Sequence, residues 1–159
     1  MKICVIVYSQ TGNTLSVAEK LKDALAAKGC DVELQRVVAT GGDPGARALD
    51  TLVQTPDPNG YDALVFASPV QAFSLAQAMQ LYLSQISCTQ AGTVCCLVTQ
   101  HFKKPWLGGN RAIRKMCALL ARKNIPTSET GIVNWSGVNR EAQIDEIVLR
   151  FSTALTEEA

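Results

Sequence analysis

The chain has 159 residues, of which 47% are hydrophobic and 18% are charged. This length suits one domain, residues 1–159, with a single sizeable core, and the composition is that of a globular protein and excludes a disordered one. Fifteen Lys and Arg against fourteen Asp and Glu leave a formal charge of +1, which provides no overall field to attract nucleic acid or an anionic membrane.

The N-terminal apolar run, residues 3–7, leads directly into a turn. It is far shorter than the ~20 residues that span a bilayer, and no signal-peptide cleavage site follows it. We therefore expect a cytoplasmic protein that binds neither nucleic acid nor membrane.

The cysteines form no metal-binding pattern, because the chain has no C-x-x-C pair and only one His. Those within apolar runs behave as small hydrophobic residues. We expect no metal site, and a redox function of the thiols is the alternative. The six are Cys4, Cys30, Cys88, Cys95, Cys96 and Cys117.

Continuous β-branched runs alternate with helical stripes along the whole chain, which predicts five strands and five helices. Gly29 ends the first helix, and Asp43-Pro44 is a start signal for the second. The expected strands cover residues 2–8, 32–38, 63–67, 93–98 and 128–134, and the expected helices cover residues 13–28, 43–53, 74–86, 110–123 and 140–155.

This alternation predicts an α/β fold, a doubly wound parallel sheet with right-handed crossovers and helices on both faces. In such a sheet the ligand lies outside the carboxyl ends of the strands, where the strand order reverses. The loops after the first, third and fourth strands are therefore the places to look for a site.

The first of these loops consists almost wholly of small hydroxyl, amide and glycine residues. Unsatisfied N–H groups and the helix dipole make the following helix N-terminus suitable for a phosphate without any cation. The alternative is an ordinary helix start with Thr11 or Asn13 as its cap. The loop residues are Ser9, Gln10, Thr11, Gly12, Asn13 and Thr14.

Residues 9–14 resemble the phosphate-binding signature of the flavodoxin family, Thr/Ser-x-Thr-Gly-x-Thr, in its usual place after the first strand. They match neither a P-loop nor a Gly-x-Gly-x-x-Gly dinucleotide fingerprint. The order and length of the elements also resemble a short-chain flavodoxin. The resemblance implies a five-stranded sheet of order 2-1-3-4-5 and FMN as the cofactor.

The loop after the third strand resembles the Ser-Pro-x loop of flavodoxin-like proteins, whose backbone amides meet the flavin ring edge. Pro69 would stiffen it. Typical carriers supply an aromatic ring and a glycine here, and Val70-Gln71-Ala72 offers neither. Phe73 is the nearby aromatic, and both flavin contact and core packing are open to it. The resemblance implies cofactor contacts from Ser68, Pro69, Val70, Gln71, Ala72 and Phe73.

The loop after the fourth strand is long and irregular, which is typical of functional segments. The resemblance implies that Trp106 or Phe102 stacks on the flavin, while Thr99 and Gln100 face its pyrimidine edge. Alternatively, Trp106 anchors the loop to the protein body. His101 could stabilise reduced flavin or donate a proton, or be a solvated surface group. The expected cofactor contacts are Thr99, Gln100, His101, Phe102, Trp106 and Gly108.

The leading hypothesis is an FMN-binding protein that transfers electrons through the flavin. Familiar carriers of the family have a large excess of carboxylates, whereas this chain has a net charge of +1, so the alternative is a small NAD(P)H-dependent reductase of quinones or similar acceptors. A flavin-free interaction domain is the third reading. The expected partner is a redox protein or NAD(P)H, and the expected state is a monomer or weak homodimer. Positive residues could steer an anionic partner or form a solvated surface: Lys103, Lys104, Arg111, Arg114 and Lys115.

Overall fold

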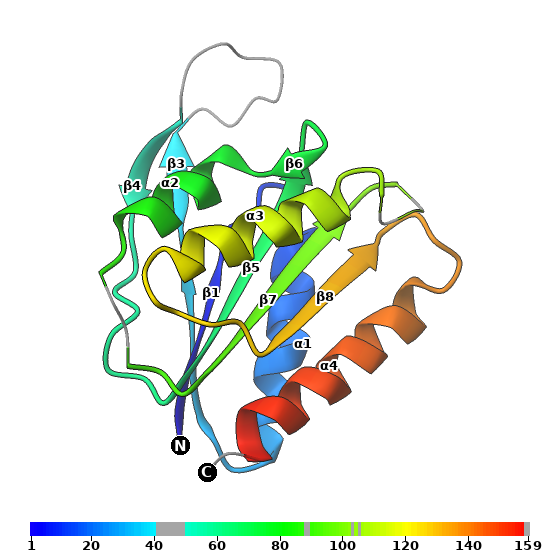
Figure 1. The fold of residues 1–159 in the computed structure, drawn as a ribbon. Helices are drawn as coiled ribbons and strands as arrows, with labels where there is room; N and C mark the ends of the chain where they lie inside the picture. The colour runs from blue at the N-terminus through cyan, green and yellow to red at the C-terminus, as the bar shows by residue number, and fades with distance from the viewer. Residues whose placement is uncertain (41–49, 88–89, 103, 105, 158–159) are drawn as a thin grey trace.

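Apolar strands form the centre of the protein. The computed structural model describes residues 1–40, 50–87, 90–102, 104 and 106–157. Five parallel strands lie in the order β2-β1-β5-β7-β8, which agrees with the order that the resemblance implied (Figure 1). Their bounds are β1 Lys2–Val7, β2 Asp31–Arg36, β5 Ala63–Gln71, β7 Thr93–Gln100 and β8 Glu129–Asn134.

Helices cover both faces of this sheet (Figure 1). Side chains of alternate strand residues face opposite layers: Cys4 and Ile6 pack with α2 and α3, whereas Ile3 and Val5 pack with α1 and α4. The central strands therefore read as unbroken apolar runs. Among the described residues, no helix has the length and hydropathy to cross a membrane. The helices are α1 Asn13–Ala27, α2 Gln77–Gln85, α3 Gly109–Ala121 and α4 Arg140–Glu157.

The end of α1 follows the sequence prediction. Gly29 has φ +85°, the left-handed conformation that glycine adopts without strain. Its N–H donates to the Ala26 carbonyl at 2.9 Å, and the Cys30 N–H donates to the Leu25 carbonyl at 3.2 Å. These two bonds form a Schellman motif, which explains why the helix stops here.

The prediction of a helix over residues 43–53 is wrong at its C-terminal end. Thr51–Gln54 form strand β4, which pairs antiparallel with β3, Val38–Thr40. Residues 43–49 lie outside the described residues. A neighbouring strand and the packing of Leu52 against the core decide the conformation, and both override the local helix signal.

Two other boundaries also differ from the sequence prediction. The expected strand 32–38 divides into β2 and β3, because the Val37 N–H still bonds to the Val7 carbonyl and the chain then leaves the sheet. The expected helix 74–86 begins only at Gln77, since β6, Ser74–Leu75, pairs antiparallel with the end of β5. A hairpin therefore extends from the carboxyl end of β5.

Candidate functional site

A cavity of about 330 Å³ opens at the carboxyl edge of the sheet, and residues from all three predicted loops line it. Its volume lies within the range of about 300–1,000 Å³ that is typical of small-molecule sites. The strand order reverses between β1 and β5, which is where doubly wound sheets bind ligands. The described lining residues are Gln10, Thr11, Asn13, Thr14, Pro69, Val70, Gln71, Ala72, Thr99, Gln100, His101 and Trp135.

The first loop is folded around the Ser9 hydroxyl. Its Oγ accepts hydrogen bonds from the Gly12 N–H at 3.2 Å and the Leu15 N–H at 3.3 Å. Gly12 is the N-cap of α1, has φ +91° and brings no side chain to the helix end, and the first turn holds no acidic residue. Ser9 is buried and Thr11 is exposed. The loop therefore presents Thr11 and the helix N-terminus to the cavity, while Ser9 holds its shape.

Side-chain hydrogen bonds tie the three loops together. The Thr14 and Thr99 hydroxyls lie 2.7 Å apart and are buried, which joins the first turn of α1 to the end of β7. Gln71 Nε2 donates to Gln10 Oε1, which joins the second loop to the first. These contacts connect the segments that line the cavity.

The second loop is the β5–β6 hairpin. Gln71 pairs with Ser74, so Ala72 and Phe73 form a two-residue turn, and both have positive φ values, +48° and +60°. Such turns favour Asn and Gly, so the tip is strained. Ser68 is buried and its hydroxyl donates to the Pro69 carbonyl at 3.1 Å, which places Ser68 outside the cavity.

Phe73 is 54% exposed, so its core-packing alternative does not hold. Its ring stacks on Phe102 with centroids 5.5 Å apart and an interplanar angle of 9°. His101 meets Phe102 edge-on at 6.0 Å and lines the cavity. The second and third loops thus contact each other through their aromatic residues.

Gln100 organises the third loop from within. Its side chain is buried; Oε1 accepts from the Gly109 N–H at 2.8 Å, while Nε2 donates to the Lys104 carbonyl at 2.6 Å and to Asn134 Oδ1. A Cβ on Gly108 would lie 2.8 Å from Val70 Cγ1, so the loop packs directly on the hairpin. Glycine at position 108 is what permits this close approach.

One aromatic residue that lines the cavity, Trp135, was not predicted from the sequence. Trp135 lines the cavity and follows β8, whose carboxyl end lies at the same edge as that of β7. The Arg140 guanidinium lies 4.6 Å from its ring centroid and orients it. The sequence signal for Trp135 is its position directly after the fifth expected strand, residues 128–134.

Phe102 and Trp106 are 42% and 69% exposed and are not among the described lining residues. Lys104 Nζ lies 5.5 Å from the Trp106 ring centroid. This exposure argues against Trp106 as an anchor to the protein body. Lys103 lies outside the described residues. The stacking of either ring on a flavin remains a prediction.

Tyr8 is buried behind the loops. Burial raises the pKa of its phenol, and the nearby Asp50 carboxylate acts in the same direction, while hydrogen bonds with Gln71 and Gln10 lower the pKa by less. The phenol therefore stays protonated at neutral pH and can serve as a hydrogen-bonding support for both loops.

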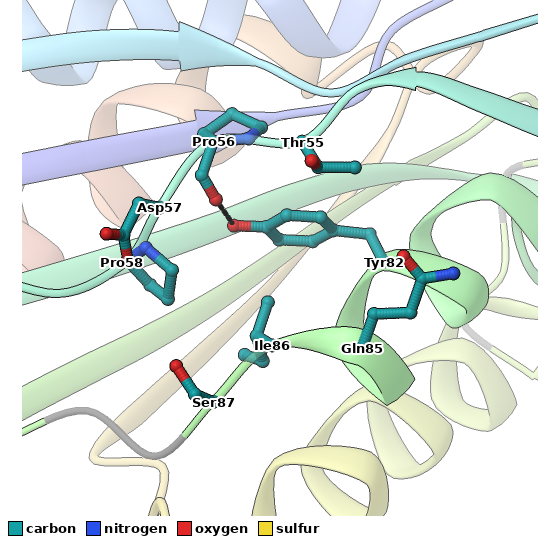
Figure 2. Close-up of a pocket in the computed structure, with 8 residues that line it drawn as sticks. All are labelled: Thr55, Pro56, Asp57, Pro58, Tyr82, Gln85, Ile86 and Ser87. Atoms are coloured by element: carbon teal, nitrogen blue, oxygen red, sulfur yellow. Dashed lines mark hydrogen bonds between the residues drawn. The ribbon is translucent and has the colours of Figure 1, made fainter.

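A second cavity, of about 200 Å³, lies between residues 55–58 and the end of α2 (Figure 2). The Tyr82 hydroxyl reaches across it and donates to the Pro56 carbonyl at 2.5 Å, and burial raises the pKa of that phenol. None of the described residues that line it belongs to the three predicted loops. The described part of the chain also holds no group of three or more His, Cys, Asp or Glu placed to bind a metal. The cavity at the carboxyl edge is therefore the candidate site.

No protein-family model and no curated protein sequence matches the chain. Among solved structures, flavodoxin from Streptococcus pneumoniae TIGR4 is similar with a TM-score of 0.70 at 15% identity, covering 100% of both chains. Oxidised flavodoxin 2 from Bacillus cereus gives 0.69 at 18% identity, again over 100% of both chains. A flavoprotein in complex with FMN from Lactobacillus acidophilus NCFM gives 0.62 at 18% identity, covering 91% of this chain and 97% of the other. The chain has the flavodoxin-like fold.

Proposed function

We propose that the protein binds FMN in the cavity at the carboxyl edge and transfers electrons through it. The observation that carries this proposal is that three loops distant in sequence line one cavity, where the strand order reverses. The residue patterns of the sequence predict a site at each of these loops. The solved flavoprotein from Lactobacillus acidophilus, which was crystallised in complex with FMN, supports the same assignment.

The first loop fits a phosphate ester. A Cβ built on Gly12 would meet no heavy atom within 4 Å, so there is open space beside the start of α1. No acidic residue stands in the first turn to repel an anion, and Thr11 can donate its hydroxyl. The helix dipole and the outward N–H groups would hold the phosphate without any Lys or Arg.

The remaining cavity walls suit a flat aromatic ring. The Pro69–Ala72 segment and Thr99–His101 both line the cavity, and the Trp135 indole would supply a surface on which a ring can stack. FMN would supply the one- or two-electron redox chemistry. The protein would orient the ring, and its hairpin would exclude water from one edge.

A second candidate function is that of a small NAD(P)H-dependent reductase. The observation that favours it is a group of positively charged side chains on α3 near the hairpin, Arg111, Arg114 and Lys115. A flavin-free interaction domain is the weaker reading, because the cavity and the helix N-terminus beside it would then have no ligand to bind.

Reconstitution tests the proposed function. The apoprotein should bind FMN with visible absorption bands shifted from those of the free flavin, and Thr11→Val should weaken FMN binding because one phosphate donor is lost. Thr51→Val, another exposed threonine, on β4, serves as the matched control and should bind FMN like the unmodified protein. A protein that takes up no FMN would overturn the proposal.

A further inference from the structure

A positively charged groove lies beside the β5–β6 hairpin. It has a volume of about 420 Å³ and lies between β6, α2 and α3. No carboxylate is among its described lining residues, and every one of those side chains can donate hydrogen bonds. They are Ser74, Gln80, Arg111, Arg114 and Lys115.

The positive charges of three groove residues destabilise α3, the helix that carries them. Arg111, Arg114 and Lys115 have spacings of i,i+3 and i,i+4, at which like charges repel one another. They occupy the first two turns of α3, at the positive end of its dipole, and no acidic residue is present in the first turn. None of the ion pairs found among the described residues includes them. A bound anion would relieve all of these repulsions.

The β5–β6 hairpin contributes residues to both the groove and the cavity. Gln71 lines the cavity and its cross-strand partner Ser74 lines the groove, and Gly108, next to the first residue of α3, packs against Val70. Phe73, which precedes Ser74, is exposed at the tip and stacks on Phe102. An extended ligand could therefore reach both sites by passing over this aromatic pair.

We propose that the groove binds the phosphate groups of a nicotinamide dinucleotide that reduces the FMN, an inference that rests on the proposed function. Guanidinium groups bind phosphate oxygens through paired hydrogen bonds, and a concave groove with two of them suits a compact anion. The exposed Phe73 and Phe102 rings supply the apolar surface that a nucleotide base needs. The pyrophosphate and a 2′-phosphate share this chemistry.

The redox step takes place between the nicotinamide dinucleotide and the FMN, and it balances without a third reactant. The nicotinamide gives up one hydride, which carries two electrons and a proton, and is oxidised. That hydride, with both its electrons and its proton, would go to bound FMN, which would be reduced. The protein's contribution would be to hold the dinucleotide phosphates in the groove, while residues 9–14 hold the flavin phosphate.

Binding of two probes to the apoprotein tests the groove without any flavin. ADP carries a pyrophosphate, and adenosine 2′,5′-bisphosphate carries a 2′-phosphate. In the Arg111→Gln/Arg114→Gln variant we expect at least one probe to bind about tenfold more weakly or worse, since charge-assisted hydrogen bonds are lost. Loss of bisphosphate binding alone assigns the groove to a 2′-phosphate, and loss of ADP binding assigns it to the pyrophosphate.

The matched control is Arg122→Gln, which removes an exposed charge at the other end of α3. It should leave both probe affinities unchanged. The proposal is overturned if neither probe binds the unmodified protein, if the double variant binds both as well as the unmodified protein does, or if Arg122→Gln causes an equal loss.

A second measurement separates this inference from the proposed function. FMN affinity of the Arg111→Gln/Arg114→Gln variant should equal that of the unmodified protein, while stopped-flow bleaching of the flavin band by NADPH should slow about tenfold at low nucleotide concentration. If the unmodified protein binds ADP or adenosine 2′,5′-bisphosphate but no FMN, the proposed function is rejected and nucleotide binding in the groove is not. Normal FMN binding with no nucleotide binding would reject only the groove.

Discussion

The hydroxyl groups of Thr14 and Thr99 lie 2.7 Å apart inside the protein and hydrogen-bond to each other. They are 85 residues apart in sequence, one in the first turn of α1 and the other at the end of β7. This contact joins the start of α1, directly after the loop of residues 9–14, to the end of β7. The shape of the candidate site therefore depends on a buried polar pair.

A double-mutant cycle measures that pair. Each of Thr14→Val and Thr99→Val should cost about 1–3 kcal/mol of unfolding free energy, because each leaves the other hydroxyl buried and without its partner. The double variant should cost less than the sum, with a coupling of about 0.5–1.5 kcal/mol. Urea unfolding at pH 7 gives these values, and strictly additive losses would contradict the role assigned to the pair.

Gly108→Ala should destabilise the protein by more than about 2 kcal/mol, because a new Cβ meets Val70 Cγ1 at 2.8 Å and the Phe73 Cα at 2.9 Å, on a backbone with φ +118°. Gly60→Ala is the control: φ is +91°, nothing lies within 4 Å, and only the backbone cost of about 1 kcal/mol applies. Urea unfolding compares them. Equal losses would show that the third loop does not pack tightly on the hairpin.

Ala72→Gly should stabilise the protein by up to about 1 kcal/mol, because the strain of φ +48° is relieved and exceeds the added entropy of the unfolded chain. The same substitution at exposed Ala26 within α1 should have the opposite sign, a loss of about 0.5–1 kcal/mol. Thermal unfolding measures the change in stability of both variants. A loss at position 72 would mean that the turn is not strained.

Tyr61 makes the stability of the protein depend on pH through the Glu33 carboxyl on the edge strand β2. Its hydroxyl donates to Glu33 Oε2 at 2.6 Å, and together with Gln35 and Lys2 it lowers the pKa of Glu33 below the usual 4.5. A carboxyl whose pKa is lowered by folding adds stability that is fully present above about 4.5 and disappears as the pH falls through the folded-state pKa.

Tyr61→Phe should therefore raise the pKa of Glu33 toward its usual value. The variant should lose more stability relative to the unmodified protein at pH 7 than at pH values below the folded-state pKa of Glu33. NMR titration of the Glu33 carboxyl carbon gives the first result and urea unfolding at the two pH values gives the second. An unchanged titration would refute the hydrogen bond as the cause.

Tryptophan fluorescence can locate the flavin ring. In Trp106→Phe the emission comes from Trp135, which lines the cavity, and FMN should quench it strongly; in Trp135→Phe the remaining Trp106, 69% exposed, should be quenched less. Stronger quenching of Trp106 would instead favour the sequence-based prediction that the third loop supplies the stacking ring.

Much of this fold follows from local signals. The unbroken apolar runs predict strands buried on both faces, and Gly29 predicts the end of α1, because both depend on the chemistry of a few adjacent residues. The strand order came instead from the resemblance of residues 9–14 to the flavodoxin signature, since periodicity does not say which strands are neighbours.

The features that the sequence did not predict depend on tertiary contacts. Thr51–Gln54 becomes a strand because β3 lies beside it, and the β5–β6 hairpin places Ala72 and Phe73 in a turn without the usual Asn or Gly. Trp135 was not predicted as a site residue, because it follows the fifth strand and does not belong to the three loops at which a site was expected. Its position at the cavity depends on β8 lying next to β7.

The ratio of the dissociation constants for riboflavin and FMN tests the central claim most directly. The two ligands differ only in the phosphate, which the loop of residues 9–14 is proposed to hold. Several hydrogen bonds to a charged phosphate, worth roughly 1.5–3 kcal/mol each, should make FMN bind at least a hundredfold more tightly. Fluorescence titration of the apoprotein gives both constants. Equal constants would contradict the account, because the first loop would then hold no phosphate.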